Sequence, residues 1–223
     1  MAELQAGPDV PSDNATRGLE RVIFFSDAVM AIALTLLAIS LPVPPSGLTD
    51  AGVWHALGGF LRQGYLTFVI TFVVIAAFWI NHHRLFENIQ RINIGLIRIN
   101  MVFLFAIVIM PYATRLFSQK GTGQAGTVLY AAAVALVGLS LLGVAWQAHR
   151  TKLFGPVAGE RESLDTVRAL AIPTIAFLIS IPLAFISTSV AEWSWLVISV
   201  LMIGVVRGLR RRSRRRALGG TPA

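Results

Sequence analysis

The chain contains no cysteine. A disulfide framework, thiol chemistry and a cysteine-based metal site are therefore excluded. Charged residues are also scarce: they make up 13% of the 223 residues, whereas hydrophobic residues make up 55%. Soluble domains carry about 25% charged residues, so this composition is typical of a membrane protein. No apolar segment carries a Ser–His or acid–acid arrangement suited to hydrolysis, which argues against an enzyme.

Long apolar runs account for most of the chain and predict an all-α membrane protein with six transmembrane helices. We expect a polar disordered tail at 1–18, a six-helix transmembrane domain at 19–208 and a basic tail at 209–223. The first apolar run lacks the basic leading region and the cleavage site of a signal peptide, so we expect it to be retained. The expected spans are 21–41, 61–81, 97–117, 127–147, 169–188 and 193–206, with a short possible helix near Trp54 and with the fifth span broken by Pro173 and Pro182.

The basic residues cluster at the ends of these spans and predict the orientation. Only Arg62, Arg115 and Lys120 fall on one side of the expected membrane, whereas the other 16 of the 19 basic residues fall on the opposite side. Because the basic side is normally cytoplasmic, we expect both termini in the cytoplasm.

The net charge of +8 does not indicate a nucleic-acid-binding protein, because the arginines and lysines follow the membrane topology. The densest run, Arg207–Arg216, predicts a topology anchor that binds anionic lipid headgroups.

The first span, from Arg21 to Leu41, contains the only acid well inside any span, Asp27. A carboxylate inside a membrane is costly, so it needs a partner and points to a function. Ile32, Leu36 and Ile39 form an apolar stripe at spacing i, i+4, i+7. Asp27 lies roughly 140° around the helix from Ile32, so the acid and the stripe face different neighbours.

Candidate donors for Asp27 are expected at the same depth. The second span ends with Trp79, His82 and His83, and the third begins with Arg98 and Asn100. Adjacent histidines point about 100° apart and no cysteine or suitable acid completes a site, so we favour hydrogen bonds over a metal.

The sequence Arg21-x-x-x-Phe25-Ser26-Asp27, followed by an Ala/Ile/Leu/Thr-rich helix, resembles the start of the first helix in the transmembrane protein 175 family. This is a family of potassium channels of lysosomes and prokaryotes. The number and order of the helices and the Trp/His-containing end of the second span resemble it as well.

The resemblance implies a potassium-permeable channel without a cofactor. It implies that symmetry-related first helices line the pore, with Ile32, Leu36 and Ile39 as a hydrophobic constriction and Thr35 contributing to selectivity. It also implies that Arg21, Phe25, Ser26 and Asp27 belong to a packing and hydrogen-bonding motif that holds this helix. Because the signature occurs once, the chain resembles the prokaryotic subunits that assemble as homotetramers in the plasma membrane.

Other interpretations of the same residues stay open. The stripe has the ordinary alternative of a lipid-facing or core surface. A secondary transporter or proton pathway would use Asp27 with His82 and His83, although the second half of the chain has no counterpart of Asp27. A membrane scaffold is a third class. The chain has no TVGYG-type filter, since Gln63-Gly64-Tyr65 does not match it, so any selectivity needs a different construction.

Overall fold

The computed structural model of the chain describes residues 13–119, 121–155, 157–195 and 197. The elements in chain order are α1 (Asp13–Ile39), α2 (Asp50–Phe60), the π-helical turn η1 (Leu61–Tyr65), α3 (Leu66–Glu87), α4 (Ile94–Ser118), α5 (Gly123–Arg150) and α6 (Val157–Ile186). A further helical segment covers residues 188–195. The all-α class expected from the sequence is confirmed for this part of the chain.

Four of the expected spans coincide with helices that are long and apolar enough to cross a bilayer: 17–39 within α1, and α3, α4 and α5. The fifth coincides with the apolar part of α6, Leu170–Ile186, which is shorter. The sixth expected span falls mostly outside the described residues, as does the Arg207–Arg216 run.

Three sequence-based expectations are corrected. α1 begins at Asp13, so residues 13–18 of the expected disordered tail are helical. The segment 157–168, which falls between the expected fourth and fifth spans, forms the first turns of α6. Pro173 and Pro182 lie inside α6 without breaking it. Each proline removes a single backbone hydrogen bond, and the rest of this 30-residue helix keeps its own.

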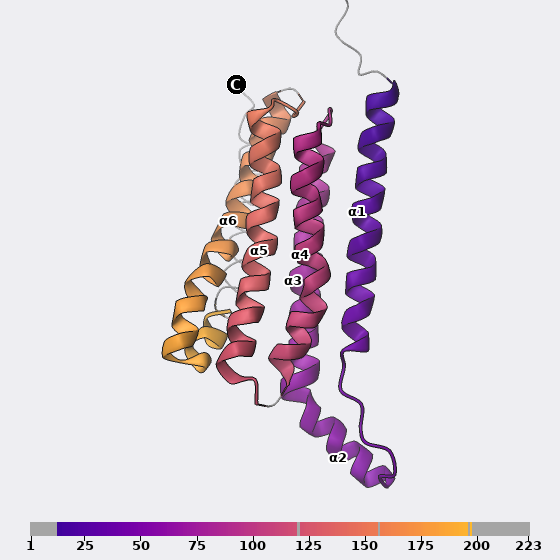
Figure 1. Ribbon diagram of the computed structural model, residues 1–223, viewed down its shortest axis with the longest axis vertical. Coiled ribbons are helices and arrows are strands. Elements are labelled where there is room, and N and C mark those ends of the chain that lie inside the picture. Colours follow the sequence, from indigo (N-terminus) through magenta and orange to yellow (C-terminus); the bar gives the residue numbers. More distant parts are fainter. Residues whose placement is uncertain (1–12, 120, 156, 196, 198–223) are drawn as a thin grey trace, which may run out of the picture.

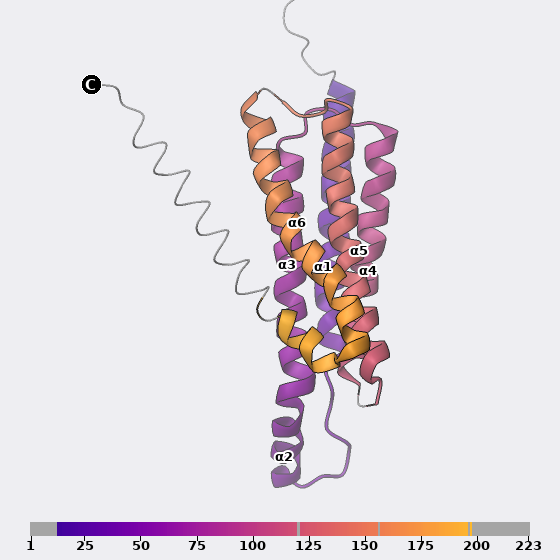
Figure 2. The ribbon, with the colours of Figure 1, turned by 90° about the vertical axis from the view of Figure 1, so that its left-hand side faces the viewer.

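The long helices run side by side as an elongated bundle (Figures 1 and 2). α1 lies at one edge and packs against α4 and α3, whereas α5 lies between α4 and α6. α2 projects beyond the bundle at one end, and no residue of α2 is buried. We call this end of the bundle the α2 end. We call the opposite end the bridge end, because two loops pair there through a β-bridge.

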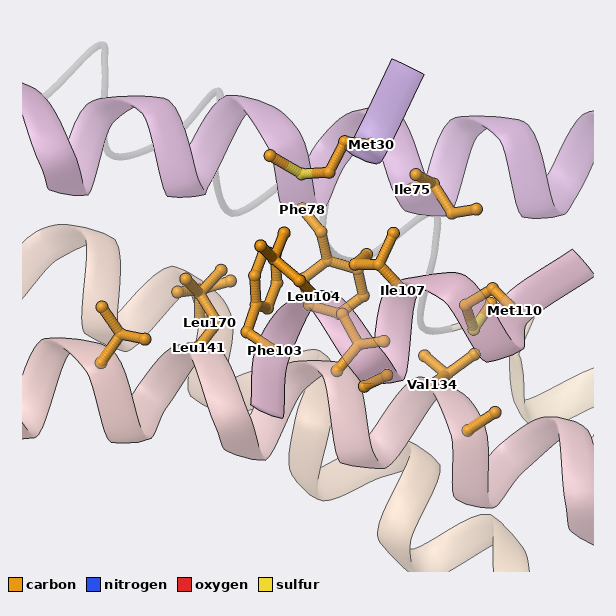
Figure 3. Close-up of a cluster of buried hydrophobic side chains, with 14 of the residues drawn as sticks. Met30, Ile75, Phe78, Phe103, Leu104, Ile107, Met110, Val134, Leu141 and Leu170 are labelled. Carbon is orange, nitrogen blue, oxygen red and sulfur yellow. The ribbon is translucent and has the colours of Figure 1, made fainter. Parts of the chain in front are cut away.

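The hydrophobic core lies where α3, α4 and α5 meet, and it also receives side chains from α1 and α6. Figure 3 shows Met30, Phe103 and Leu141 in this cluster, all of them fully or almost fully buried. Within the most apolar 18-residue stretch of each helix, 61% of the residues of α5 are buried, but only 22% of those of α1. α5 is therefore the central helix, and α1 leaves much of its surface uncovered by the described residues.

Small residues allow α5 and α6 to pack closely. A Cβ atom added at Gly138 of α5 would overlap the side chain of Thr174 in α6. Close approach at small residues is a common way to pack membrane helices, because burial away from water supplies no driving force between helices inside lipid.

At the bridge end, the loop between α3 and α4 pairs with the loop between α5 and α6. Ile89 and Phe154 form an isolated antiparallel bridge. The amide of Gln90 donates to the carbonyl of Leu153 at 2.9 Å, and the amide of Gly155 donates to the carbonyl of Asn88 at 3.1 Å. The two helical hairpins are thus joined at this end through their backbones.

Candidate functional site

α1 has one face buried in the bundle and another left open. Ser26, Met30, Ala33 and Leu37, at spacing i, i+4, i+7, i+11, are at most 1% exposed. The stripe expected from the sequence lies on the open face: Ile32 is 58% exposed, Leu36 41% and Ile39 79%. A helix at the edge of the bundle thus presents an aliphatic row that the rest of the described chain does not cover.

Thr35 lies beside this open row and is exposed. Its hydroxyl donates to the carbonyl of Ile32, one turn earlier, at 2.8 Å. The hydroxyl oxygen keeps lone pairs that face away from its own hydrogen bond, so Thr35 can still accept a hydrogen bond or face a cation.

Ser26 belongs to a buried hydrogen-bond chain that joins three helices. The side-chain amide of Asn100 in α4 donates to Ser26 Oγ at 2.9 Å, and Asn100 Oδ1 lies 3.0 Å from His82 Nε2 in α3. Ser26 in turn donates to the carbonyl of Val22 within α1 at 2.8 Å. All three linking side chains are 0% exposed. The chain therefore fixes α1 to α4 and α3 at one depth.

The tautomer of His82 follows from this arrangement. Asn100 Oδ1 can only accept, so Nε2 of His82 carries a hydrogen, and Nδ1 has no acceptor for a second hydrogen, which favours the neutral ring. Nδ1 is then an unprotonated acceptor, and it is buried without a hydrogen-bond partner among the described residues. The ring stacks on Phe103 and Phe86, with centroids 5.0 and 4.3 Å away. This apolar enclosure favours the uncharged ring.

Asp27 has a partner of its own, separate from this chain. The indole Nε1 of Trp79 in α3 donates to Asp27 Oδ1 at 2.8 Å. Trp79 stacks on His83 with centroids 5.6 Å apart, and His83 Nε2 lies 3.2 Å from Glu87 Oε1. Asp27 is half-buried. The bond to Trp79 holds its carboxylate where α1 contacts α3, on a side of α1 away from the open stripe.

The remaining residues of the expected motif lie apart from these hydrogen bonds. Arg21, Phe25 and Arg98 are exposed. Within the described part of the chain, neither arginine contacts Asp27 through a hydrogen bond or ion pair. Of the donors expected for Asp27, Trp79 bonds to it, whereas His82 and Asn100 bond to each other and Asn100 bonds to Ser26 instead. No group of three or more His, Asp or Glu side chains among the described residues is arranged to hold a metal.

Known proteins that resemble the chain share both its sequence and its fold. The sequence model of the family described as "Endosomal/lysosomal potassium channel TMEM175" matches residues 21–111. A potassium channel of Streptomyces collinus is 29% identical over 172 residues, which cover 75% of this chain and 82% of that protein. The chain is thus similar in sequence to the TMEM175 family over the residues that the family model matches.

Two further comparisons extend this result. The crystal structure of a lysosomal potassium-selective channel TMEM175 homolog from Chamaesiphon minutus superposes with a TM-score of 0.72 at 22% identity, covering 84% of this chain and 97% of that one. This likeness shows a shared fold. The endosomal/lysosomal proton channel TMEM175 of Danio rerio is 27% identical over 56% of this chain, which corresponds to 24% of that longer protein.

The part of the chain that matches the TMEM175 family model contains the open stripe and both hydrogen-bonded groups on α1. It starts at Arg21 and extends past Asn100. The family is one of ion channels and not of enzymes, and the chain is a multi-pass membrane protein with at least four helices able to span.

Sequence reasoning missed a second polar cluster towards the α2 end. Thr114 of α4 donates to Thr71 of α3 at 3.2 Å, and Thr71 lies 3.1 Å from the hydroxyl of Tyr130 in α5. All three side chains are at most 2% exposed. Each is a common residue in an apolar helix. A threonine hydroxyl can bond back to its own helix, so only the hydroxyl of Tyr130 needs a partner from another element when it is buried. The presence of Tyr130 in an apolar run does not indicate that Thr71 and Thr114 are its neighbours.

Proposed function

We propose that this chain forms a potassium-permeable ion channel in which the open face of α1 lines the conduction path. The observation that carries the proposal is the contrast between the two faces of α1, one fully buried and the other an aliphatic row exposed over several turns. The potassium channels among its relatives support the choice of ion.

The proposed assembly is a homotetramer with the four α1 helices around the axis. A single copy leaves the stripe without a partner inside the described residues, and cyclic symmetry would bring four copies of it together. Ile32, Leu36 and Ile39 then form rings of aliphatic side chains. Such rings gate by excluding water when the pore is narrow.

Thr35 is the proposed contributor to potassium selectivity. It lies next to the stripe, and its hydroxyl is the only side-chain oxygen between Ile32 and Ile39. Replacement of Thr35 by valine keeps the shape of the side chain and removes the hydroxyl. We expect a lower potassium-to-sodium flux ratio with the path still open.

The deciding experiment measures potassium and sodium flux into liposomes that contain the purified protein, under a set gradient. Leu36→Ala removes about three methylene-sized groups from each subunit at the constriction, which should wet the pore, raise the flux and lower the selectivity. The matched control is Leu139→Ala. Leu139 is also an exposed leucine, 46% against 41% for Leu36, but it lies on α5.

A flux increase confined to Leu36→Ala supports the proposal. Equal effects of the two truncations would show that this face of α1 does not line the pore. Wild-type liposomes without any potassium flux above empty liposomes would reject the channel itself.

The second candidate is a proton pathway through Asp27, His82 and His83. The observation in its favour is that the animal relatives are named as proton channels. The hydrogen bonds of these residues form two separate groups: Asp27 bonds to Trp79, whereas His82 bonds to Asn100. A pH-sensitive dye inside the same liposomes tests this candidate. His82→Phe should abolish proton uptake if the pathway exists and leave potassium flux in place.

The proposed location is a bacterial plasma membrane with both termini in the cytoplasm, which puts the bridge end inside and the α2 end outside. The charge distribution and the bacterial relatives support this orientation.

A further inference from the structure

A cleft of about 530 Å³ opens at the α2 end, between the end of α1, the end of α2, the π-helical turn η1 and the last turn of α4. Its size falls within the range of small-molecule sites, about 300–1,000 Å³. It is far from the hydrogen-bonded groups on α1 that lie towards the bridge end. Nothing in the family relationship assigns a role to it.

The cleft has an apolar wall and a polar wall. Leu41, Pro42 and Phe60 contribute to the apolar wall, and Arg115, Ser118 and Gln119 of the end of α4 form the polar one. The apolar wall is fixed in place, because Pro42 packs so closely on η1 that a Cβ atom at Gly64 would overlap the proline ring. A π-helical turn is uncommon and often accompanies a functional site.

The polar wall carries a positive charge without a counter-charge. Arg115 is exposed, and its guanidinium has no hydrogen bond or ion pair with any other described residue. Ser118 donates to the carbonyl of Arg115 at 3.0 Å, which leaves the lone pairs of its hydroxyl and the amide of Gln119 for a ligand.

We propose that this cleft binds the phosphate group of an anionic phospholipid, with the guanidinium of Arg115 on the phosphate and the lipid backbone against Pro42 and Phe60. A guanidinium presents two parallel N–H groups that match phosphate oxygens. The apolar wall favours a lipid over a free anion, because a soluble phosphate would leave half of the cleft without contacts. The place fits as well, since α4 reaches the end of its membrane-spanning stretch here.

The test compares purified, delipidated protein with and without added phosphatidylglycerol, phosphatidylcholine or inorganic phosphate. Thermal unfolding measures the stabilisation, and native mass spectrometry counts the retained lipids. We expect saturable stabilisation by phosphatidylglycerol, about one such lipid per chain, and a weaker response to phosphatidylcholine. Arg115→Gln should weaken phosphatidylglycerol binding about tenfold or more, since it removes the charge-assisted hydrogen bonds. The affinity of Arg115→Lys for phosphatidylglycerol should lie between those of the wild-type protein and of Arg115→Gln.

Arg98→Gln is the matched control. Arg98 is an exposed arginine of the same helix α4 at the opposite end, where it would meet headgroups without a cleft. It should keep the phosphatidylglycerol response of the wild-type protein.

Three outcomes would overturn the proposal. Equal losses in Arg115→Gln and Arg98→Gln would mean that any arginine at the end of a span gives the effect. Equal stabilisation by inorganic phosphate would make the ligand a soluble anion. Loss of assembly in Arg115→Gln, with no change in lipid binding per chain, would mean that a second copy of the chain fills the cleft. None of these readouts depends on ion flux, so the result is independent of the proposed channel function.

Discussion

Replacing Asn100 by leucine should reveal how much the buried hydrogen-bond chain stabilises the fold. Leucine has a similar size and no polar atoms, so the packing is kept while two interhelical hydrogen bonds are lost. Ser26 keeps its bond to Val22, but the Nε2–H group of His82 is left buried without an acceptor. Such a group costs about 1–3 kcal/mol. We expect a decrease of that size in the free energy of unfolding.

The assay is reversible unfolding in mixed micelles with increasing denaturing detergent, followed by tryptophan fluorescence. Asn81→Leu is the matched control, because the amide of Asn81 donates only to the carbonyl of Ala77 in its own helix. This control should change the stability by no more than about 0.5 kcal/mol.

A double-mutant cycle with His82→Phe separates the hydrogen bond from the packing. Phenylalanine fits between the two rings that already stack on His82. Each single variant leaves one orphaned partner, whereas the double variant removes both, so its cost should fall short of the sum of the two. Interhelical hydrogen bonds in membranes show couplings of about 0.6 kcal/mol, with a maximum of about 1.7. Additive costs, or equal effects of Asn100→Leu and Asn81→Leu, would refute this account.

The remaining predictions concern three other places. Asp27→Asn should destabilise the assembled protein less than Asp27→Ala, and Trp79→Phe should reproduce part of the loss of stability. The ion preference of all three variants should be unchanged. An altered ion preference in a stable Asp27→Ala assembly would put the carboxylate in the pore. Gly138→Leu should separate α5 from α6 and lower the thermal stability by several degrees, and wild-type stability would contradict the close packing seen there. Single cysteines introduced into this cysteine-free chain test the orientation: one at Ser46 should react with an impermeant reagent in intact cells and one at Glu87 should not, and the reverse pattern would invert the topology.

Much of the fold could be predicted because lipid-spanning helices leave a strong local signal. Continuous apolar runs located α3, α4 and α5 to within a few residues at most boundaries, since few other structures tolerate such runs. The prediction that the prolines would break α6 was wrong. A proline destabilises an isolated helix, but neighbouring helices support α6. The proline signal is local, whereas the support from α5 comes from residues about 35 positions away in the sequence, such as Gly138 beside Thr174.

The site was predicted in part for a similar reason. The angle between Asp27 and Ile32 depends only on helix geometry, and in the structure the two do lie on different faces of α1. The partners of a side chain depend on how helices rotate about their own axes, and the sequence carries no direct signal for that rotation. The carboxylate therefore meets Trp79 but not Arg98, although both were expected at the same depth.

The pairing of the two loops at the bridge end has a mechanical consequence. Backbone hydrogen bonds tie the α3–α4 hairpin to the α5–α6 hairpin there, and the side-chain amide of Asn93 adds a further link to Thr151 at 3.0 Å. At the other end, α2 projects beyond the bundle, and none of its residues is buried. The paired loops thus hold the two hairpins together at the bridge end, whereas α2 is held by no buried side chain, so low-energy motion should displace α2 and leave the paired loops in place. The amide of Gln90 should then exchange with solvent hydrogen more slowly than the amides of α2.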